Sequence, residues 1–324
     1  MDVLSEIFSV LRLEAGLYFS TCLRGDFAVR LAAEHRHIRF HLALEGECVV
    51  TVPGQQQARL VEGDLVLIPD GASQILSSGI DVCSAIDLGD VLSRAPPADG
   101  VLTFGEEGAL CRLLCGFVRF DEALDHPVLN NLPPVIVLPR HGGRADGEGA
   151  AGVTAALALL RAEAEAAQGG QTSIIHRVVE ILLMQTVRSS LVEQGPNAAS
   201  FPGALADPRL SRALTAIHSE AERGWNVDTL ARAAGMSRTR FAQRFTEAIG
   251  LAPIAYLTQW RMIKARQLLG QPGLDMAEIA ERCGYQSVPA FGRRFAATFG
   301  TGPGEWRRQN LASMRGASTH AQSH

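Results

Sequence analysis

The feature that most constrains the fold is a pattern that the C-terminal hundred or so residues contain twice. Leu230-Ala231 and Gly235 match Ile279-Ala280 and Gly284 at an offset of 49 residues. Beyond the glycine the offset is 50, because the second copy has one more residue in its turn. At that offset the matched pairs are Ser237 with Ser287, Phe241 with Phe291, Arg244 with Arg294, Phe245 with Phe295, Gly250 with Gly300, and Pro253 with Pro303.

Each copy predicts a helix, a tight turn and a second helix. Gly235 and Gly284 are expected to end the first helices, since glycine takes the left-handed conformation at little steric cost. The predicted N-caps are Asn226 and Asp275 for the first helices and Ser237 and Ser287 for the second. A short turn between two short helices is typical of the helix-turn-helix motif. An ordinary helical bundle is the alternative, but it does not explain matched glycines and phenylalanines.

The second helix of each copy indicates the partner. Phe241 and Phe245 share one face at helical spacing, so Thr239 and Gln243 point the opposite way, with Arg240 beside them. In the second copy Arg293 projects opposite the phenylalanine pair. Polar faces of this kind suit base edges and phosphates. The residues expected to bind DNA are Arg238, Thr239, Arg240, Gln243, Arg244, Ser287, Val288, Arg293 and Arg294.

The charge distribution agrees with a nucleic-acid partner. Residues 205–310 carry 15 Lys and Arg against 9 Asp and Glu, whereas residues 1–204 have a net charge of −11. The chain total of −4 therefore combines a basic C-terminal part with an acidic N-terminal part. Only the basic part suits the phosphate backbone.

These residues carry a resemblance to a known family. The runs LARAAGMSRTRFAQRFTEAIG (230–250) and IAERCGYQSVPAFGRRFAATFGTGPGEWR (279–307) resemble the DNA-binding domain of AraC/XylS transcription regulators. The resemblance implies two recognition helices that enter successive major grooves on one face of double-stranded DNA. We assign residues 205–310 to this domain.

The N-terminal part shows the period-two pattern of strands. Ile38, Phe40, Leu42 and Leu44 alternate with more polar residues such as His41, which predicts a half-buried strand after a short helix and lead-in over residues 1–20. Further strands are expected at 48–52, 65–68, 82–88 and 110–120. Short strands punctuated by Gly, Pro and Asp indicate a small barrel or sandwich.

Two runs in this part are similar to the halves of a cupin barrel. They are FHLALEGE (40–47) and GDLVLIPDGASQ (63–74), and the order of motifs along residues 1–148 resembles the cupin-type sensor of one AraC-like subgroup. A catalytic cupin has a histidine in its second motif, where this chain has Gln74. We therefore expect neither metal nor cofactor, although a ligand cluster of His35, His37, His41 and Glu45 stays an alternative.

Residues 149–194 are predicted to be helical. Ile174, Val178, Ile181 and Leu182 belong to an apolar stripe that is too wide for one covered face. The stripe could pack on the barrel within one chain, but the family resemblance favours a linker and dimerisation segment. Residues 195–205, rich in Pro, Ala and Gly, are the expected linker, and residues 311–324 are an expected disordered tail.

The cysteines suggest one signal that such a domain could sense. Cys111 and Cys115 fall on one face of a strand about 13 Å apart, too far to bridge each other. Cys22 lies in a polar stretch near Arg24, and the resembled subgroup includes regulators that respond to oxidants through cysteines at matching places. Cys22 and Cys115 are thus candidate redox residues. A small apolar effector in the barrel is the competing signal.

The combined prediction is a multidomain α and β protein. It has an N-terminal cupin-like β-barrel, a helical linker/dimerisation segment and an all-α C-terminal domain with two helix-turn-helix units. We expect a homodimeric, sequence-specific transcription regulator rather than an enzyme, in which an effector or oxidant modulates operator binding or RNA polymerase recruitment. The sequence leaves open whether it is an activator or a repressor. The alternatives are a cupin dioxygenase or isomerase with an appended domain and an architectural DNA binder. No basic leader or long apolar span is evident, so a cytoplasmic location without a membrane contact is expected.

Overall fold

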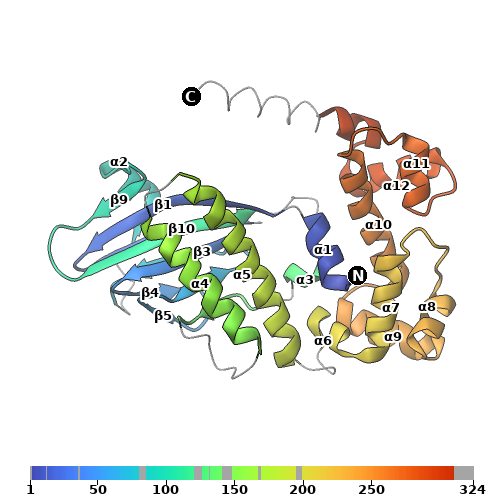
Figure 1. Ribbon diagram of the computed structural model, residues 1–324, viewed down its shortest axis with the longest axis horizontal. Coiled ribbons are helices and arrows are strands. Elements are labelled where there is room, and N and C mark those ends of the chain that lie inside the picture. Colours follow the sequence, from blue (N-terminus) through green and yellow to red (C-terminus); the bar gives the residue numbers. More distant parts are fainter. Residues whose placement is uncertain are drawn as a thin grey trace. The chain divides into compact units, whose positions relative to one another are not determined.

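The structure is a computed structural model, and it describes residues 2–11, 13–35, 37–79, 85–119, 126–130, 132–140, 148–166, 169–194 and 199–309. The chain separates into two compact units (Figure 1). One comprises residues 12–193, and the other comprises residues 194–324 together with residues 1–11. Cys83, residues 195–198 of the predicted linker and the predicted tail lie outside the described residues.

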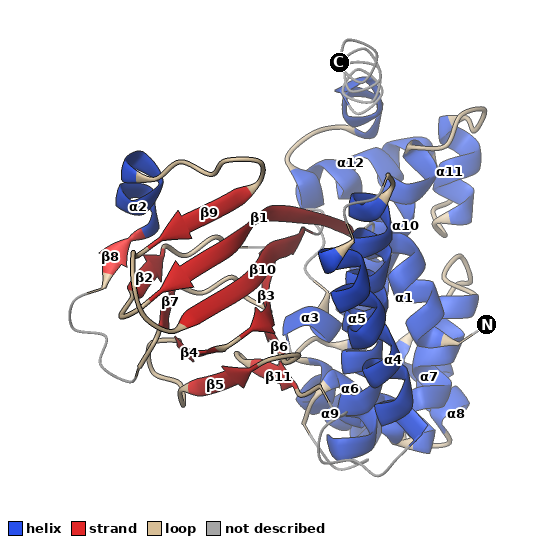
Figure 2. Ribbon diagram, turned by 60° about the vertical axis from the view of Figure 1, so that its left-hand side comes forward, coloured by secondary structure: helices blue, strands red, loops and turns tan. Residues whose placement is uncertain are grey.

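The first unit is built on two β-sheets (Figure 2). The six-stranded sheet has the order β11-β6-β3-β10-β1-β9, and the five-stranded sheet has the order β5-β4-β7-β2-β8. The strands are β1 (Glu14–Arg24), β2 (Ala28–Leu31), β3 (His37–Glu45), β4 (Glu47–Thr51), β5 (Ala58–Val61), β6 (Leu65–Ile68), β7 (Gln74–Ser77), β8 (Ile86–Asp87), β9 (Val101–Phe104), β10 (Leu110–Arg119) and β11 (Ile136–Leu138).

Both sheets contribute to one apolar interior. Leu23, Ala43 and Leu113 come from the six-stranded sheet, and Val50 and Leu76 come from the five-stranded sheet. The barrel-like arrangement that the cupin resemblance implies is therefore present. Its strands also place polar residues on the inside, and these form part of the candidate site.

Strand β3 differs from the half-buried strand that its alternation predicts. Every residue from Ile38 to Leu44 is buried. His41 points into the interior, where it contacts Cys115 and Gln74. Helices α4 (Glu148–Glu165) and α5 (Gln171–Gln194) lie over the sheet that contains β3 (Figures 1 and 2). Arg161 of α4 bonds to Glu62 at the turn before β6, with 2.7 Å between the Nη2 and Oε1 atoms.

Other strands are confirmed or corrected. The predicted strand 65–68 coincides with β6, and β10 fills the strand predicted at 110–120. Strand β1 was missed, because its apolar residues alternate with Ser20, Cys22 and other polar residues without a clear period. In the range 82–88 the described strand is only β8, and α2 (Leu88–Arg94) follows it directly. Between β10 and β11 lies α3 (Pro127–Asn130).

The long helix α5 resolves the wide apolar stripe into two parts. Val178 and Leu182 are buried, at 2% and 0% exposure, whereas Ile174 and Ile181 are 40% and 42% exposed. Helices α4 and α5 are close neighbours, since a Cβ on Gly152 would lie 2.8 Å from the Gln185 side chain. Most of the stripe therefore packs within the unit, and the two isoleucines stay on its surface.

The second unit is helical. Its helices are α1 (Val3–Leu11), α6 (Phe201–Ala206), α7 (Pro208–Ser219), α8 (Val227–Ala234), α9 (Arg238–Ile249), α10 (Pro253–Leu269), α11 (Met276–Arg282) and α12 (Val288–Phe299). The N-terminal helix belongs to this unit, because its Val3, Ile7 and Val10 are buried and it contacts α7 and α10.

The repeat extends further back than the sequence match. Arg212 of α7 donates from Nη2 to the Ala234 carbonyl at 3.0 Å, beside the turn at Gly235. Arg261 of α10, 49 residues later, lies in the same place beside Gly284. Gly235 and Gly284 have φ values of 64° and 75°, which confirms the left-handed turns. Each copy is thus a three-helix unit, α7-α8-α9 and α10-α11-α12.

The predicted caps hold at three of the four positions. Asn226 forms a capping box with Thr229, Asp275 accepts from the Glu278 amide, and Ser287 accepts from the Ala290 amide. Ser237 occupies the N-cap position of α9, but its hydroxyl makes no cap hydrogen bond.

One further detail of the helical unit differs from the sequence prediction. Part of the predicted linker 195–205 is helix α6, capped by Ser200, with Phe201 fully buried.

Candidate nucleic-acid interface and interior pocket

Helix α9 presents the polar face that the sequence predicts. Phe241 and Phe245 are fully buried, with ring centroids 5.5 Å apart, and they fix the rotation of the helix. Thr239, Arg240 and Gln243 are consequently exposed. The Gln243 amide nitrogen donates to Glu247 at 2.9 Å, a surface hydrogen bond that a base edge could replace.

Helix α12 repeats the arrangement. Phe291 and Phe295 are buried with ring centroids 5.8 Å apart, and Arg293 is exposed. Val288 is 37% exposed in the first turn. Ser287 is also exposed, and its hydroxyl accepts from the Ala290 amide at 3.4 Å. The face opposite the phenylalanines therefore offers one cation, Arg293, and an apolar patch at its N-terminal end.

Three more of the arginines expected to bind DNA, Arg238, Arg244 and Arg294, each have a neighbour on the protein. Arg238 lies 3.4 Å from Asp228. Arg244 pairs with Asp207 at 2.9 Å, and only 13% of the Asp207 side chain is exposed. Arg294 is exposed and hydrogen-bonds Tyr285. Arg244 is therefore the most strongly held of the three by the fold.

The structure brings together a cationic depression that the sequence did not reveal. Arg209 and Arg212 of α7 converge with Arg240 and Arg244 of α9 around Asp207, in an open depression of about 450 Å³. Four guanidinium groups against one carboxylate suit an anion such as a DNA phosphate. Arg209 and Arg212 were missed because the predicted interface was confined to the second helix of each copy. The repeat at residues 212 and 261 was the available signal.

The first unit contains a pocket between its two sheets. Its walls are mostly aliphatic, with Leu23, Val29, Leu31, Leu76 and Leu102 among them. Its volume is about 80 Å³, several times what one water molecule requires. Its polar lining residues include Thr21 and a group of three side chains, Tyr18, Glu34 and Arg39.

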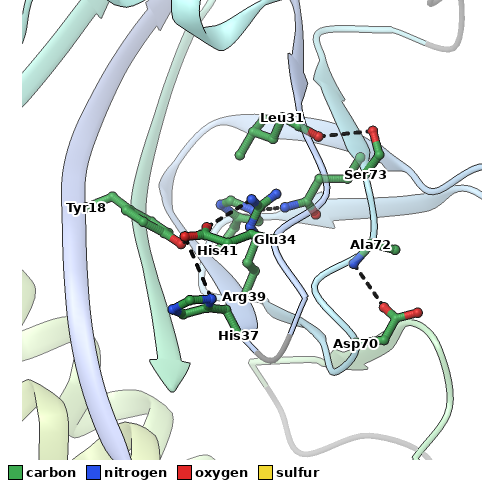
Figure 3. Close-up of polar contacts among 10 residues, drawn as sticks. Tyr18, Leu31, Glu34, His37, Arg39, His41, Asp70, Ala72 and Ser73 are labelled. Carbon is green, nitrogen blue, oxygen red and sulfur yellow. Dashed lines mark hydrogen bonds and ion pairs between the residues drawn. The ribbon is translucent and has the colours of Figure 1, made fainter. Parts of the chain in front are cut away.

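Those three side chains form one hydrogen-bonded group (Figure 3). Tyr18 donates its hydroxyl to Glu34, and Arg39 donates from Nη2 to the same Glu34 oxygen at 3.0 Å. His37 lies 3.7 Å from the other oxygen. Burial raises the pKa of Glu34, but the hydrogen bonds from Tyr18 and Arg39 outweigh it, so the pKa is lowered and the group stays ionised.

Deeper in the interior, His41 joins the two sheets. Gln74 donates from Nε2 to His41 Nε2 at 3.0 Å, which places the ring proton on Nδ1, 3.1 Å from the Cys115 sulfur. Burial lowers the pKa of His41 to about 3, so the imidazole is neutral. Among the described residues, no three His, Cys, Asp or Glu side chains converge to hold a metal ion. Of the predicted alternative ligands, His37 turns to Glu34 and Glu45 to Arg112.

The two candidate redox cysteines do not face each other. Cys115 lies opposite Phe19 in the β1–β10 ladder, whereas Cys22 lies opposite Arg112. Cys115 points into the interior and Cys22 points out of the other face, and three residues of strand separate them by about 10 Å. A direct Cys22–Cys115 disulfide therefore does not fit this fold, since bridged Cα atoms lie within about 7 Å.

The interior contains a closer thiol pair that the sequence did not indicate. Cys48 of β4 hydrogen-bonds Cys111 of β10, and this contact lowers the pKa of Cys111 while it raises that of Cys48. Both side chains are nearly inaccessible, at 1% and 2% exposure. Burial raises the pKa of Cys115 as well, so its thiol stays protonated at neutral pH.

A barrel-like β-domain followed by two helix-turn-helix units with exposed arginines defines a transcription regulator of two domains. Comparison with known proteins agrees: a cupin family model matches residues 2–191, and a helix-turn-helix domain model matches residues 230–309. The chain belongs to the AraC-like transcription regulators.

Individual relatives cover nearly the whole chain. A putative AraC-like transcription regulator of Streptomyces lividans is 32% identical over 95% of this chain and 98% of its own length. The HTH-type transcriptional regulator AlkR of Acinetobacter baylyi is 30% identical over 96% of this chain and 100% of its own. Among solved structures, the DNA-binding domain of AdpA in complex with a target DNA is 32% identical, covers 33% of this chain and 95% of that chain, and has a TM-score of 0.31.

The relatives are transcription regulators, which agrees with a protein that is not an enzyme. No helix within the described ranges has both the length and the apolar character needed to cross a bilayer.

Proposed function

We propose that this protein is a homodimeric, cytoplasmic transcription activator that reads its operator through α9 and α12 and whose cupin-like domain responds to a small effector. The observation that carries the DNA readout is the pair of buried phenylalanines in each helix. They turn Arg240, Gln243 and Arg293 to solvent. The response would change operator affinity or the recruitment of RNA polymerase.

Base readout is tested by single substitutions on a mapped operator. A genome-wide map of bound sites identifies the operator, and Arg240→Ala, Gln243→Ala and Arg293→Ala are then titrated against it. Each change should cost about 1–3 kcal/mol on the operator and relax preference at one base pair. Arg59→Ala removes an exposed arginine of the β-domain and is the matched control. Equal losses on operator and random DNA for Arg293→Ala would refute base readout by that residue.

Dimerisation is proposed through the exposed apolar residues of the helical segment. Ile174 and Ile181 lie seven residues apart on α5, on one exposed side of the helix, and Leu159 of α4 is 46% exposed. Two linked DNA-binding domains gain effective concentration on a paired site.

The exposure of each side chain on α5 determines which substitutions test this dimer. Ile181→Glu should give a folded monomer, measured by sedimentation, because its side chain is already 42% exposed. Leu182→Glu is the contrasting variant and should unfold the unit, since Leu182 is fully buried. A dimer that persists in Ile174→Glu/Ile181→Glu would exclude this surface.

The signal that the cupin-like domain senses could be a small effector or an oxidant. The pocket with its polar group supports the effector, and the distance between Cys22 and Cys115 weakens an oxidant response through that pair. Transcription from the operator with and without mild oxidant, in wild type and in Cys22→Ser, separates the two. Loss of an oxidant response in Cys22→Ser would reinstate the redox signal. Stoichiometric iron, manganese or zinc in the purified protein would instead favour the metalloenzyme alternative.

A further inference from the structure

Arg261 lies at the point where α10 passes from the first helix-turn-helix copy to the second (Figure 1). The residue before it, Trp260, packs against His218 of α7, with ring centroids 4.1 Å apart. The residue after it, Met262, belongs to the apolar core of the second copy. Every described residue of that core follows Arg261 in the chain, so the described residues of α7, α8 and α9 form no part of it.

The guanidinium of Arg261 contacts both copies. Its Nε atom donates to the Ala221 carbonyl at 2.7 Å, and its Nη2 atom donates to the Arg223 carbonyl at 2.8 Å. These carbonyls belong to the loop after the C-terminal end of α7, where a cation is favoured. On the other side lies Gly284 of the second copy, since a Cβ at that position would be 2.5 Å from Nη2. The same Cβ would be 2.7 Å from the Glu222 carbonyl oxygen, so the loop and the turn lie against each other.

The equivalent arginine of the first copy makes a different contact. Arg212 occupies the same position in α7, 49 residues earlier, and donates to the Ala234 carbonyl at 3.0 Å. That carbonyl belongs to its own copy, at the end of α8. The repeat therefore supplies an arginine twice, but Arg261 reaches from the second copy into the first.

Short segments connect this contact to both recognition helices. In the second copy the Tyr285 ring centroid lies 5.9 Å from the Arg261 guanidinium and 5.8 Å from the ring centroid of Phe291, a buried anchor of α12. In the first copy Trp225 donates from Nε1 to the Glu220 carbonyl at 2.8 Å, directly before the capping box that begins α8. A rotation of one copy against the other therefore breaks contacts of Arg261.

We propose that Arg261 is a positioning residue for DNA recognition, which holds α9 and α12 at the separation and angle that two successive major grooves require. Such grooves recur on one face of the duplex after about 34 Å, or about 10 base pairs. A pair of helices that is already fixed binds both grooves directly, whereas a loosely joined pair must be ordered at a cost in free energy. The inference rests on the proposed function in that α9 and α12 both read DNA.

The spacing that the full-length protein accepts tests this role. The DNA segments read by α9 and α12 are located with the Gln243→Ala and Arg293→Ala variants. One base pair is then inserted between the two segments, which moves one of them by about 3.4 Å and turns it by about 35°. The ratio of Kd for this DNA to Kd for the intact operator is the insertion penalty, measured by fluorescence anisotropy.

We expect an insertion penalty of about tenfold or more in the wild type and about threefold or less in Arg261→Met, because the variant lets the two helices adjust to the new spacing. A loss of charge or of folded protein raises both Kd values by the same factor. The insertion penalty therefore responds to positioning and not to a general weakening of the domain.

Two further variants complete the test. Arg261→Lys keeps the charge but has one nitrogen where the arginine uses two, so its insertion penalty should lie between those of Arg261→Met and the wild type. Arg266→Met is the matched control on the same helix. The Arg266 guanidinium lies 5.1 Å from the ring centroids of both Phe299 and Trp306, which pack on the core of the second copy. This variant should keep the wild-type insertion penalty.

The outcomes separate this inference from the proposed function. A wild-type insertion penalty in Arg261→Met, or in Arg261→Lys where the methionine variant does not fold, overturns the inference and leaves the proposed function standing. Wild-type tolerance of the inserted base pair, or an equal reduction of the penalty in Arg266→Met, overturns it as well. A wild type without preference for the operator over random DNA refutes the proposed function, and this inference with it.

Discussion

Substitution of Asp207 by asparagine should strengthen the salt dependence of DNA binding. Asp207 lies among Arg209, Arg212, Arg240 and Arg244, and it pairs with Arg244 at 2.9 Å. The carboxylate also caps α7 by accepting from the Arg209 amide at 2.9 Å. Asparagine keeps the cap, since it is an equally good N-cap, but it removes the ion pair and releases Arg244 for a phosphate.

The size of the effect follows from counterion release. One additional phosphate contact makes the slope of log K against log salt more negative by about 0.9, so the loss of affinity between about 50 and 200 mM salt grows about 3.5-fold. The folded unit should lose about 0.5–1 kcal/mol with the ion pair. Fluorescence anisotropy on a labelled operator at four salt concentrations measures the slope, and urea denaturation measures the stability.

A matched variant separates the cluster from the overall charge. Asp275→Asn removes one charge from the equivalent kind of N-cap, on α11, where the carboxylate accepts from the Glu278 amide. We expect a slope change clearly smaller than that of Asp207→Asn. An unchanged or shallower slope for Asp207→Asn would show that the depression does not contact phosphates, and equal changes in both variants would show that only net charge matters.

Two further predictions concern stability. Gly284→Ala should destabilise the helical unit more than Gly235→Ala in urea denaturation. Each substitution costs about 1–2 kcal/mol because alanine disfavours the left-handed conformation, and at Gly284 the new Cβ would also lie 2.7 Å from the Glu222 carbonyl oxygen. Equal losses of stability in the two variants would contradict this reasoning. Burial lowers the pKa of both His41 and His126 from 6.5 to about 3. Below pH 6.5 the unfolded chain therefore takes up protons that the folded chain does not. Each histidine should lower the free energy of unfolding by on the order of 1.4 kcal/mol per pH unit, down to about pH 3. Thermal unfolding across this range should show a shallower loss in His41→Gln than in the wild type, and identical profiles would exclude His41 as a contributor.

The helix-turn-helix units could be predicted from the sequence because their determinants are local. Gly235 and Gly284 have a positive φ, a conformation that glycine itself predicts, and the spacing of Phe241 and Phe245 alone defines a buried face. Long-range geometry was less accessible. The role of Arg212 depends on a contact with the Ala234 carbonyl 22 residues away, which no local pattern indicates.

In the β-domain the determinants of the candidate site are mostly long-range, and the sequence predicted less of it. Period-two alternation identified β3, but alternation cannot tell a strand with one wet face from a strand whose second face is covered by helices. Arg39 therefore lies on a face of β3 that alternation alone predicts to be exposed. The separation of Cys22 from Cys115 likewise depends on the register of β1 against β10, and a shift of one residue would put them on the same face.

In the interior of the β-domain Gln74 has a structural role at the position where a catalytic cupin has a metal-binding histidine. Its amide holds His41 Nε2, and His41 Nδ1 is directed at Cys115, so both ring nitrogens are engaged. A metal at this place would have to break the hydrogen bond to Gln74 or the contact with Cys115, and the surrounding burial already lowers the pKa of the imidazole to about 3. The group instead links β7 to β3 and β10 across the two sheets.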